Sequence, residues 1–224
     1  MTTLIKICGL TTAGALDAAL SERAELVGFV FFPPSPRHVS LDLARDLGTQ
    51  VRGRARKVAL TVDADDALHD AIVAALAPDM LQLHGHESPE RVRALKARFG
   101  LPVMKALPVE TAADLDAVPA YAAAADWLLF DARPPKDATR PGGLGRPFDW
   151  TLLKGLDPGL PFMLSGGLDP GNVGEALEVT GASAVDVSSG VELTPGVKDP
   201  TKVMAFIRAV RAADAARTTL ASSI

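Results

Sequence analysis

The chain contains a single cysteine, Cys8, among its 224 residues. One thiol cannot form a disulfide within the chain, and this is typical of proteins from a reducing compartment, so we expect a cytoplasmic protein. Residues 1–6 lack the basic region and the apolar stretch of a secretory signal. The sequence also has no run of about 18 apolar residues, so no membrane-spanning helix is expected.

Clustered positive charge is missing as well. The chain has 23 Lys and Arg against 27 Asp and Glu, which gives a net charge of −4. Nucleic acids and anionic membranes bind clustered cations, so neither is expected as a partner. No group of side chains has the spacing of a metal site, so we expect no metal ion. A small anion can still be bound locally, by backbone N–H groups and a few cations.

Apolar residues, in contrast, make up 48% of the chain, and many of them fall in eight short runs. Most of these runs are apolar on both faces, as parallel strands covered on each side are. The predicted strands are residues 4–8, 26–32, 58–62, 80–84, 102–106, 127–131, 161–165 and 184–188.

Segments with helical spacing separate the runs. Leu43, Leu47 and Val51, for example, stand four residues apart and form one apolar stripe. Capping residues mark three helix starts, two of them followed by proline. These starts are Ser40, Ser88-Pro89-Glu90 and Asp169-Pro170.

Eight repeats of one strand and one helix predict a single-domain (β/α)8 TIM barrel over residues 1–224, with a frayed tail after about residue 216. A doubly wound open sheet is the alternative, but eight units is many for such a sheet. The longest connection, residues 132–148, is rich in Gly and Pro. A loop of that length usually has a function.

The active site of this barrel type lies at the carboxyl ends of its strands. Cys8 ends the first run and is either a small core residue or a general base, because a thiol with a pKa of about 8.5 needs only modest help to ionise near pH 7. Asp131 ends the sixth run and is either the cap of the next loop or a general acid kept protonated by burial. The second interpretation of Asp131 requires Arg133 to turn away, which Pro134 and Pro135 favour by ending the strand.

Two further side chains are candidates for substrate contact. Arg37 follows a proline-rich segment, and its guanidinium suits a planar carboxylate, which it would bind through two hydrogen bonds. The alternative is a solvated loop arginine. His84 shares a strand face with Gln82 and is either structural or in contact with the substrate.

Small residues follow the last two predicted strands. Gly166 and Gly167 come after the seventh, and Ser188, Ser189 and Gly190 come after the eighth. Glycine exposes backbone N–H groups and allows close approach, and this fold commonly binds phosphate at these two strands. A Gly-Gly pair also occurs in tight turns, but small-residue loops at both strands together favour a phosphate site.

With these residues assigned, the sequence resembles the phosphoribosylanthranilate isomerase family over nearly its whole length and in the right order. The first and last motifs are highly specific. The matching motifs are Lys6-Ile7-Cys8-Gly9-Leu10, Gly28-Phe29-Val30-Phe31 with Ser35-Pro36-Arg37, Gln82-Leu83-His84-Gly85, Phe130-Asp131, Phe148-Asp149-Trp150, Leu164-Ser165-Gly166-Gly167-Leu168 with Asn172-Val173, and Val185-Asp186-Val187-Ser188-Ser189-Gly190-Val191-Glu192 with Gly196-Val197-Lys198-Asp199.

The resemblance implies an enzyme of tryptophan biosynthesis. It would convert N-(5-phosphoribosyl)anthranilate to 1-(2-carboxyphenylamino)-1-deoxyribulose 5-phosphate, an Amadori rearrangement of a phosphosugar that needs no cofactor. We expect a monomer or a homodimer. By matched position, the implied roles are general base for Cys8, general acid for Asp131, carboxylate binding for Arg37, sugar contacts for His84 and Asp186, and phosphate binding for Gly166, Gly167, Ser188, Ser189 and Gly190.

Two other functions are alternatives to this one. The histidine-pathway isomerase runs the same chemistry on a substrate with two phosphates and typically has an Asp where Cys8 stands. It would need a second anion site after the third strand, where Asp63, Asp65 and Asp66 would repel a phosphate. A non-catalytic phosphosugar-binding barrel would have no reason to place both Cys8 and Asp131 at strand ends.

The sequence departs from the family pattern in the loop at residues 142–146. Leu144 and Arg146 stand where the family usually has a small hydroxyl residue and a lysine. The resemblance therefore does not define the contacts of this loop.

Overall fold

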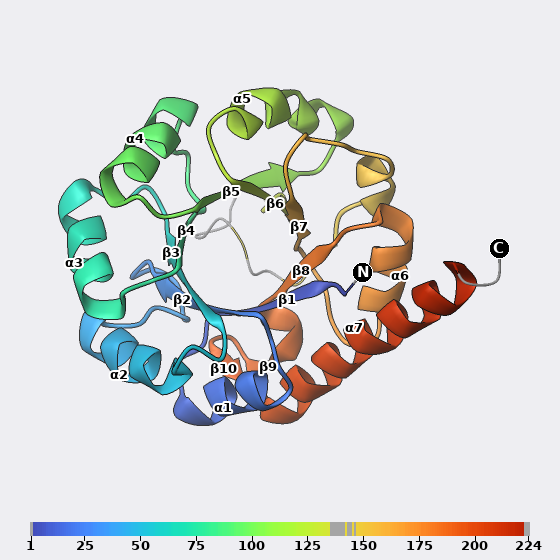
Figure 1. Cartoon of the computed structure of the whole chain (residues 1–224), viewed down its shortest axis with the longest axis horizontal. Helices are drawn as coiled ribbons and strands as arrows, with labels where there is room; N and C mark the ends of the chain where they lie inside the picture. Colours follow the sequence, from blue (N-terminus) through green and yellow to red (C-terminus); the bar gives the residue numbers. More distant parts are fainter. Residues whose placement is uncertain (1, 135–141, 143–144, 146, 222–224) are drawn as a thin grey trace.

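Eight parallel strands form a closed barrel at the centre of the computed structural model, in the order β1 to β8 (Figure 1). The structure describes residues 2–134, 142, 145 and 147–221. Strand β1 pairs with both β2 and β8, which closes the ring. The barrel strands are β1 (Leu4–Cys8), β2 (Leu26–Phe31), β3 (Arg56–Thr61), β4 (Met80–Leu83), β5 (Val103–Val109), β6 (Trp127–Ala132), β7 (Phe162–Leu164) and β8 (Ala184–Val187).

Helices surround the barrel in Figure 1 and cover its outer face. The α-helices are α1 (Ala13–Ser21), α2 (Leu41–Val51), α3 (Asp66–Leu76), α4 (Pro89–Phe99), α5 (Val118–Ala122), α6 (Val173–Thr180) and α7 (Pro200–Ala221). Short 3-10 helices are η1 (Ala112–Ala117), η2 (Trp150–Leu153) and η3 (Ser189–Val191), and a small hairpin is formed by β9 (Glu192–Thr194) and β10 (Val197–Lys198). The predicted (β/α)8 barrel is confirmed, and each predicted strand overlaps one barrel strand.

Two of the three predicted helix starts are confirmed. Ser40 and Ser88 each accept a hydrogen bond from a backbone N–H in the first turn of the helix that follows, and Pro89 occupies the first turn of α4. The start predicted at Asp169 is wrong, because α6 begins at Val173. The Asp169 carboxylate accepts hydrogen bonds from the backbone N–H groups of Gly171 and Asn172, so it caps a turn that precedes the helix.

The expectation of one α-helix after every strand is wrong for the sixth unit. Between β6 and β7 the described residues form only the 3-10 helix η2. Gly and Pro are frequent in this connection, and both residues disfavour a helix. At the other end of the chain, helix α7 extends to Ala221. Extending an existing helix adds one hydrogen bond per residue without a new nucleus.

The inside of the barrel is apolar near the amino ends of the strands and polar near their carboxyl ends. Alternate residues of each strand point inward, and those near the amino ends of the strands are apolar. This apolar group is Leu26, Val58, Met80, Met104, Ala106, Leu129, Met163 and Ala184. Nearer the carboxyl ends the buried residues include Lys6, Gln82, Asp131 and Asp186. The fold therefore collects polar side chains at the end where (β/α)8 enzymes place their active sites.

Candidate functional site

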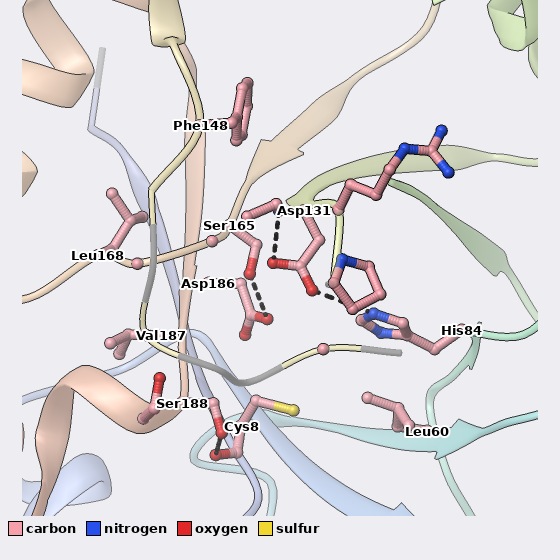
Figure 2. Close-up of a pocket in the computed structure, with 18 of the residues that line it drawn as sticks. Cys8, Leu60, His84, Asp131, Phe148, Ser165, Leu168, Asp186, Val187 and Ser188 are labelled. Atoms are coloured by element: carbon pink, nitrogen blue, oxygen red, sulfur yellow. Dashed lines mark hydrogen bonds and ion pairs between the residues drawn. The ribbon is translucent and has the colours of Figure 1, made fainter. Parts of the chain in front are cut away.

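A pocket of about 440 Å³ opens at the carboxyl ends of the barrel strands (Figure 2). Its volume is within the range of small-molecule sites, about 300–1,000 Å³. The predicted site residues that line it are Cys8, Arg37, His84, Asp131, Gly166, Gly167, Asp186, Ser188 and Ser189. Gly190, the remaining one, does not line the pocket. A Cβ atom at Gly190 would lie 1.9 Å from the carbonyl oxygen of Leu168, so this glycine lets the loops after β7 and β8 pack together.

Cys8 lies at the end of β1 with only 3% of its surface exposed. Burial raises the pKa of its thiol, and the charge of Lys6 lowers that pKa only in part. In the unliganded site Cys8 is therefore a neutral thiol near pH 7. The sequence suggested that an ordinary thiol needs little help to ionise, but it did not show that burial opposes ionisation here.

Lys6 and Asp186 form a buried ion pair beneath Cys8. The distance from Lys6 Nζ to Asp186 Oδ1 is 2.9 Å, and neighbouring strands hold the two residues in register. Burial alone would lower the pKa of Lys6, but the charge and hydrogen bond of Asp186, together with the neighbouring Cys8, outweigh burial and raise that pKa. Ser165 Oγ lies 3.4 Å from the second oxygen of Asp186 (Figure 2). Lys6 therefore remains a cation inside the barrel, two residues from Cys8 on the same strand face.

Asp131 is 5% exposed, and both of its carboxylate oxygens are engaged. Oδ1 accepts a hydrogen bond of 3.0 Å from the backbone N–H of Ala132, and Oδ2 lies 3.2 Å from His84 Nε2 (Figure 2). The amide nitrogen of Gln82 lies 3.1 Å from the other ring nitrogen of His84. A Cβ atom at Gly142 would lie 2.5 Å from Asp131 Oδ2, so Gly142 lies directly against this carboxylate and has no room for a side chain.

Arg133 turns away from Asp131, as the interpretation of Asp131 as an acid requires. Strand β6 ends at Ala132, and the guanidinium of Arg133 binds Asp114 and lies 3.7 Å from Glu110. Two acidic residues on the β5 side of the pocket therefore bind this arginine.

Arg37 is a buried residue, 4% exposed, and not a solvated loop arginine. Its Nε and one terminal nitrogen donate to the two carboxylate oxygens of Glu192 over 2.7 and 2.8 Å. Lys198 Nζ donates to the same carboxylate over 2.7 Å. Burial raises the pKa of Glu192, but these hydrogen bonds and charges outweigh burial and hold that pKa below its ordinary value. Glu192 thus fixes the plane of the Arg37 guanidinium at the pocket wall.

The wall beside Arg37 and Cys8 is apolar. Val30, Phe32, Leu60 and Val62 line the pocket at the ends of β2 and β3 and pack around Cys8. A flat apolar ring that carries a carboxylate fits this combination of an apolar wall and an adjacent arginine. None of these four residues was predicted as a site residue from the sequence, although strand alternation places Val30 and Leu60 on the inner face.

The loops after β7 and β8 form the opposite side of the pocket. Gly166 and Gly167 have φ angles of +87° and +68°, a conformation that favours glycine. Ser188 Oγ donates to the backbone carbonyl oxygen of Cys8 over 3.2 Å (Figure 2). The hydroxyl proton of Ser188 is therefore used within the protein.

The three carboxylates after β3 each have a partner. Asp63 accepts from the backbone and ring nitrogens of His86, Asp65 caps helix α3 at Leu68, and Asp66 binds Arg91. Among the described residues, no group of three or more His, Cys, Asp or Glu is placed to hold a metal ion. None of the helices described above combines the length and apolar character that crossing a membrane requires.

The chain is similar to known proteins over most of its length. The family model of N-(5′-phosphoribosyl)anthranilate (PRA) isomerase matches residues 5–209. The N-(5′-phosphoribosyl)anthranilate isomerase of Rhodopseudomonas palustris (strain BisB5) is 67% identical over 214 residues, which cover 96% of this chain and 98% of the relative.

Solved structures agree with the sequence comparison. Phosphoribosyl anthranilate isomerase from Thermotoga maritima is 32% identical and superposes with a TM-score of 0.85, covering 95% of this chain and all of the other. A second structure shows phosphoribosyl anthranilate isomerase in complex with reduced 1-(o-carboxyphenylamino)-1-deoxyribulose 5-phosphate. It is 31% identical and superposes with a TM-score of 0.82, covering 94% of this chain and all of the other.

Proposed function

The chain belongs to the N-(5′-phosphoribosyl)anthranilate isomerase family and is an isomerase of tryptophan biosynthesis, and from this premise we propose that Cys8 is its general base and Asp131 its general acid. The observation that carries the proposal is the position of both side chains in one pocket, between two walls of different chemistry. Arg37 and the apolar residues beside it suit the anthranilate carboxylate and ring. The loops after β7 and β8 suit the phosphate.

The rearrangement divides into steps that these two residues can serve. Asp131 donates a proton to the ring oxygen while the C1′–O bond breaks, and the nitrogen lone pair forms a C1′=N iminium. The thiolate of Cys8 then removes the proton from C2′, and the C–H electrons form a C1′=C2′ bond and neutralise the nitrogen. The resulting enol loses its hydroxyl proton as C1′ gains one, which gives the ketone. The proton transfers assigned to Asp131 and Cys8 are ordinary general acid–base steps.

The two residues must enter the reaction in opposite protonation states. Asp131 has to carry a proton, and Cys8 has to have lost one. Because burial raises the pKa of Cys8, the thiolate is a small fraction near neutral pH, but each thiolate is a stronger base. His84 lies within hydrogen-bonding distance of Asp131 and orients it.

A crystal structure with the reduced product, 1-(o-carboxyphenylamino)-1-deoxyribulose 5-phosphate, tests the whole arrangement. We expect the ring against Val30 and Leu60, the carboxylate at Arg37 and the phosphate at Gly167 and Ser189. Cys8 and Asp131 should then lie on the two sides of the sugar carbons. A ligand bound in the reverse direction, with its phosphate at Arg37, would show that the assignment of the two walls is wrong.

Replacing Arg37 with alanine should impair substrate binding more than the chemical step. Arg37 is remote from the reacting carbons, so its loss should remove about 1.5–3 kcal/mol of binding to ground and transition states alike, which appears as a raised KM. Steady-state kinetics, followed by the loss of phosphoribosylanthranilate fluorescence, measure the split. Arg133→Ala removes another arginine of the same pocket and is the matched control, with a KM near that of the parent. A large fall in kcat at constant KM for Arg37→Ala would contradict the assigned role.

The enzyme should have one phosphate site and not two. Sulfate or phosphate should bind near Gly167 and Ser189, and none should bind after β3, where Asp63, Asp65 and Asp66 carry negative charge. Crystals soaked in phosphate, together with an assay on the bis-phosphorylated histidine-pathway intermediate, measure both points. Anion density at the loop after β3 would contradict this prediction. Efficient isomerisation of that intermediate would contradict it as well.

A further inference from the structure

Lys198 is a buried lysine for which the reaction described above has no use. It lies in β10, opposite Glu192 in the neighbouring strand β9, and its side chain has no exposed surface. Its Nζ donates to the carbonyl oxygen of Ser188 over 2.8 Å and to Glu192 over 2.7 Å, and it lies 3.2 Å from Ser188 Oγ. An ammonium group has three N–H donors, so these contacts use all of them. Lys198 therefore acts on the loop after β8 and not on the substrate directly.

We propose that Lys198 is a positioning residue for the substrate phosphate, because it fixes the peptide between Ser188 and Ser189. The inference rests on the proposed phosphate site. A trans peptide directs its C=O and N–H groups to opposite sides, and no cis peptide occurs among the described residues. With the Ser188 carbonyl held by Lys198, the N–H of Ser189 points away from that lysine, toward the pocket that both serines line.

The charges around Lys198 support this role. Arg37 and Lys198 share one carboxylate, that of Glu192, so the charge of Lys198 lies beside the loop after β8, where it would attract a phosphate. The ammonium group also polarises the Ser188 carbonyl, which makes the Ser189 N–H of the same peptide a stronger donor.

The test compares Lys198→Met with the parent enzyme. This variant leaves Glu192 paired with Arg37, so the carboxylate does not become an unpaired buried charge. Lys202→Met is the matched control, because Lys202 is an exposed lysine of α7 that donates to the backbone of Glu192. The measurements are kcat, KM, the inhibition constant of inorganic phosphate, and the movement of the Ser189 amide resonance when phosphate is added.

Lys198→Met should weaken the binding of inorganic phosphate about tenfold and raise KM by a similar factor, with kcat within about threefold of the parent. Lys202→Met should behave like the parent, in which phosphate competes with substrate and moves the Ser189 resonance. If Lys198→Met does not fold, Lys198→Gln is expected to show the same split, because it also lacks the charge and is too short to reach all three acceptors.

The possible failures are distinguishable. If phosphate neither competes nor moves the Ser189 resonance in the parent, the proposed phosphate site itself is wrong. If phosphate does both in the parent and binds Lys198→Met with unchanged affinity, the site stands and the role of Lys198 is overturned. Equal losses of kcat and thermal stability, with unchanged phosphate affinity, would show that Lys198 only supports the fold and would also overturn the inference.

Discussion

Replacing Cys8 with alanine should abolish turnover while the binding of the reduced product stays largely intact. Cys8 is the proposed base, and the loss of a general base typically costs about 10²–10⁴-fold in rate. The thiol is small and is not expected to contact the carboxylate or the phosphate, so the ligand keeps its main contacts. Fluorescence loss on turnover measures the first effect, and titration with the reduced product measures the second. Near-normal turnover by Cys8→Ala would show that Cys8 is not the general base.

Two further measurements separate the base from a packing residue. Cys8→Ser keeps a small polar side chain but should leave little activity, because a hydroxyl is far too weak an acid to ionise here. In the parent, kcat/KM should rise with pH beyond the range of an ordinary thiol, since burial raises the pKa of Cys8. The rate of Cys8 alkylation by iodoacetamide should rise over the same pH range. A thiol that is fully ionised near pH 7 would contradict the environment described for Cys8.

Asp131→Asn should lower kcat at least about 10²-fold, because asparagine keeps the shape of the side chain but cannot donate the proton that opens the ring. The amide can still accept from Ala132, so the fold and the binding of the reduced product should be preserved. Single-turnover kinetics measure the chemical step directly. Glu110→Gln is the matched control, since Glu110 also lines the pocket but has no assigned part in the reaction. If Asp131→Asn were nearly as active as the parent, the acid would have to be another group.

The barrel could be predicted from the sequence because parallel strands covered on both sides leave a repeating apolar signal. The same signal predicted most of the site residues, because it shows where each strand ends and the active site of this fold lies at the carboxyl ends of its strands. Cys8 and Asp131 were identified because each interrupts or ends an apolar run. The place where Arg133 turns away was also predictable, from the prolines that follow it.

Contacts between distant segments could not be predicted in the same way. Nothing near Arg37 in the sequence indicates that Glu192 binds it, because the pair depends on how β9 packs against the loop after β2. The burial that raises the pKa of Cys8 likewise comes from several strands at once. Helix α6 starts after Asn172 because Asp169 caps the preceding turn, and local capping signals cannot separate a turn from a helix start.

The pairing of β1 with β8 makes the first and last strands of the barrel neighbours. The proposed base lies on the first strand and half of the proposed phosphate site follows the last one, so a chain still being synthesised cannot hold its substrate. Asp214 in α7 reinforces this closure by accepting hydrogen bonds from the backbone and the hydroxyl of Thr3. A ligand that bridges the two strands binds only the closed ring, and its binding free energy adds to the stability of that ring. The metabolite that the enzyme consumes would therefore also protect newly made chains against unfolding.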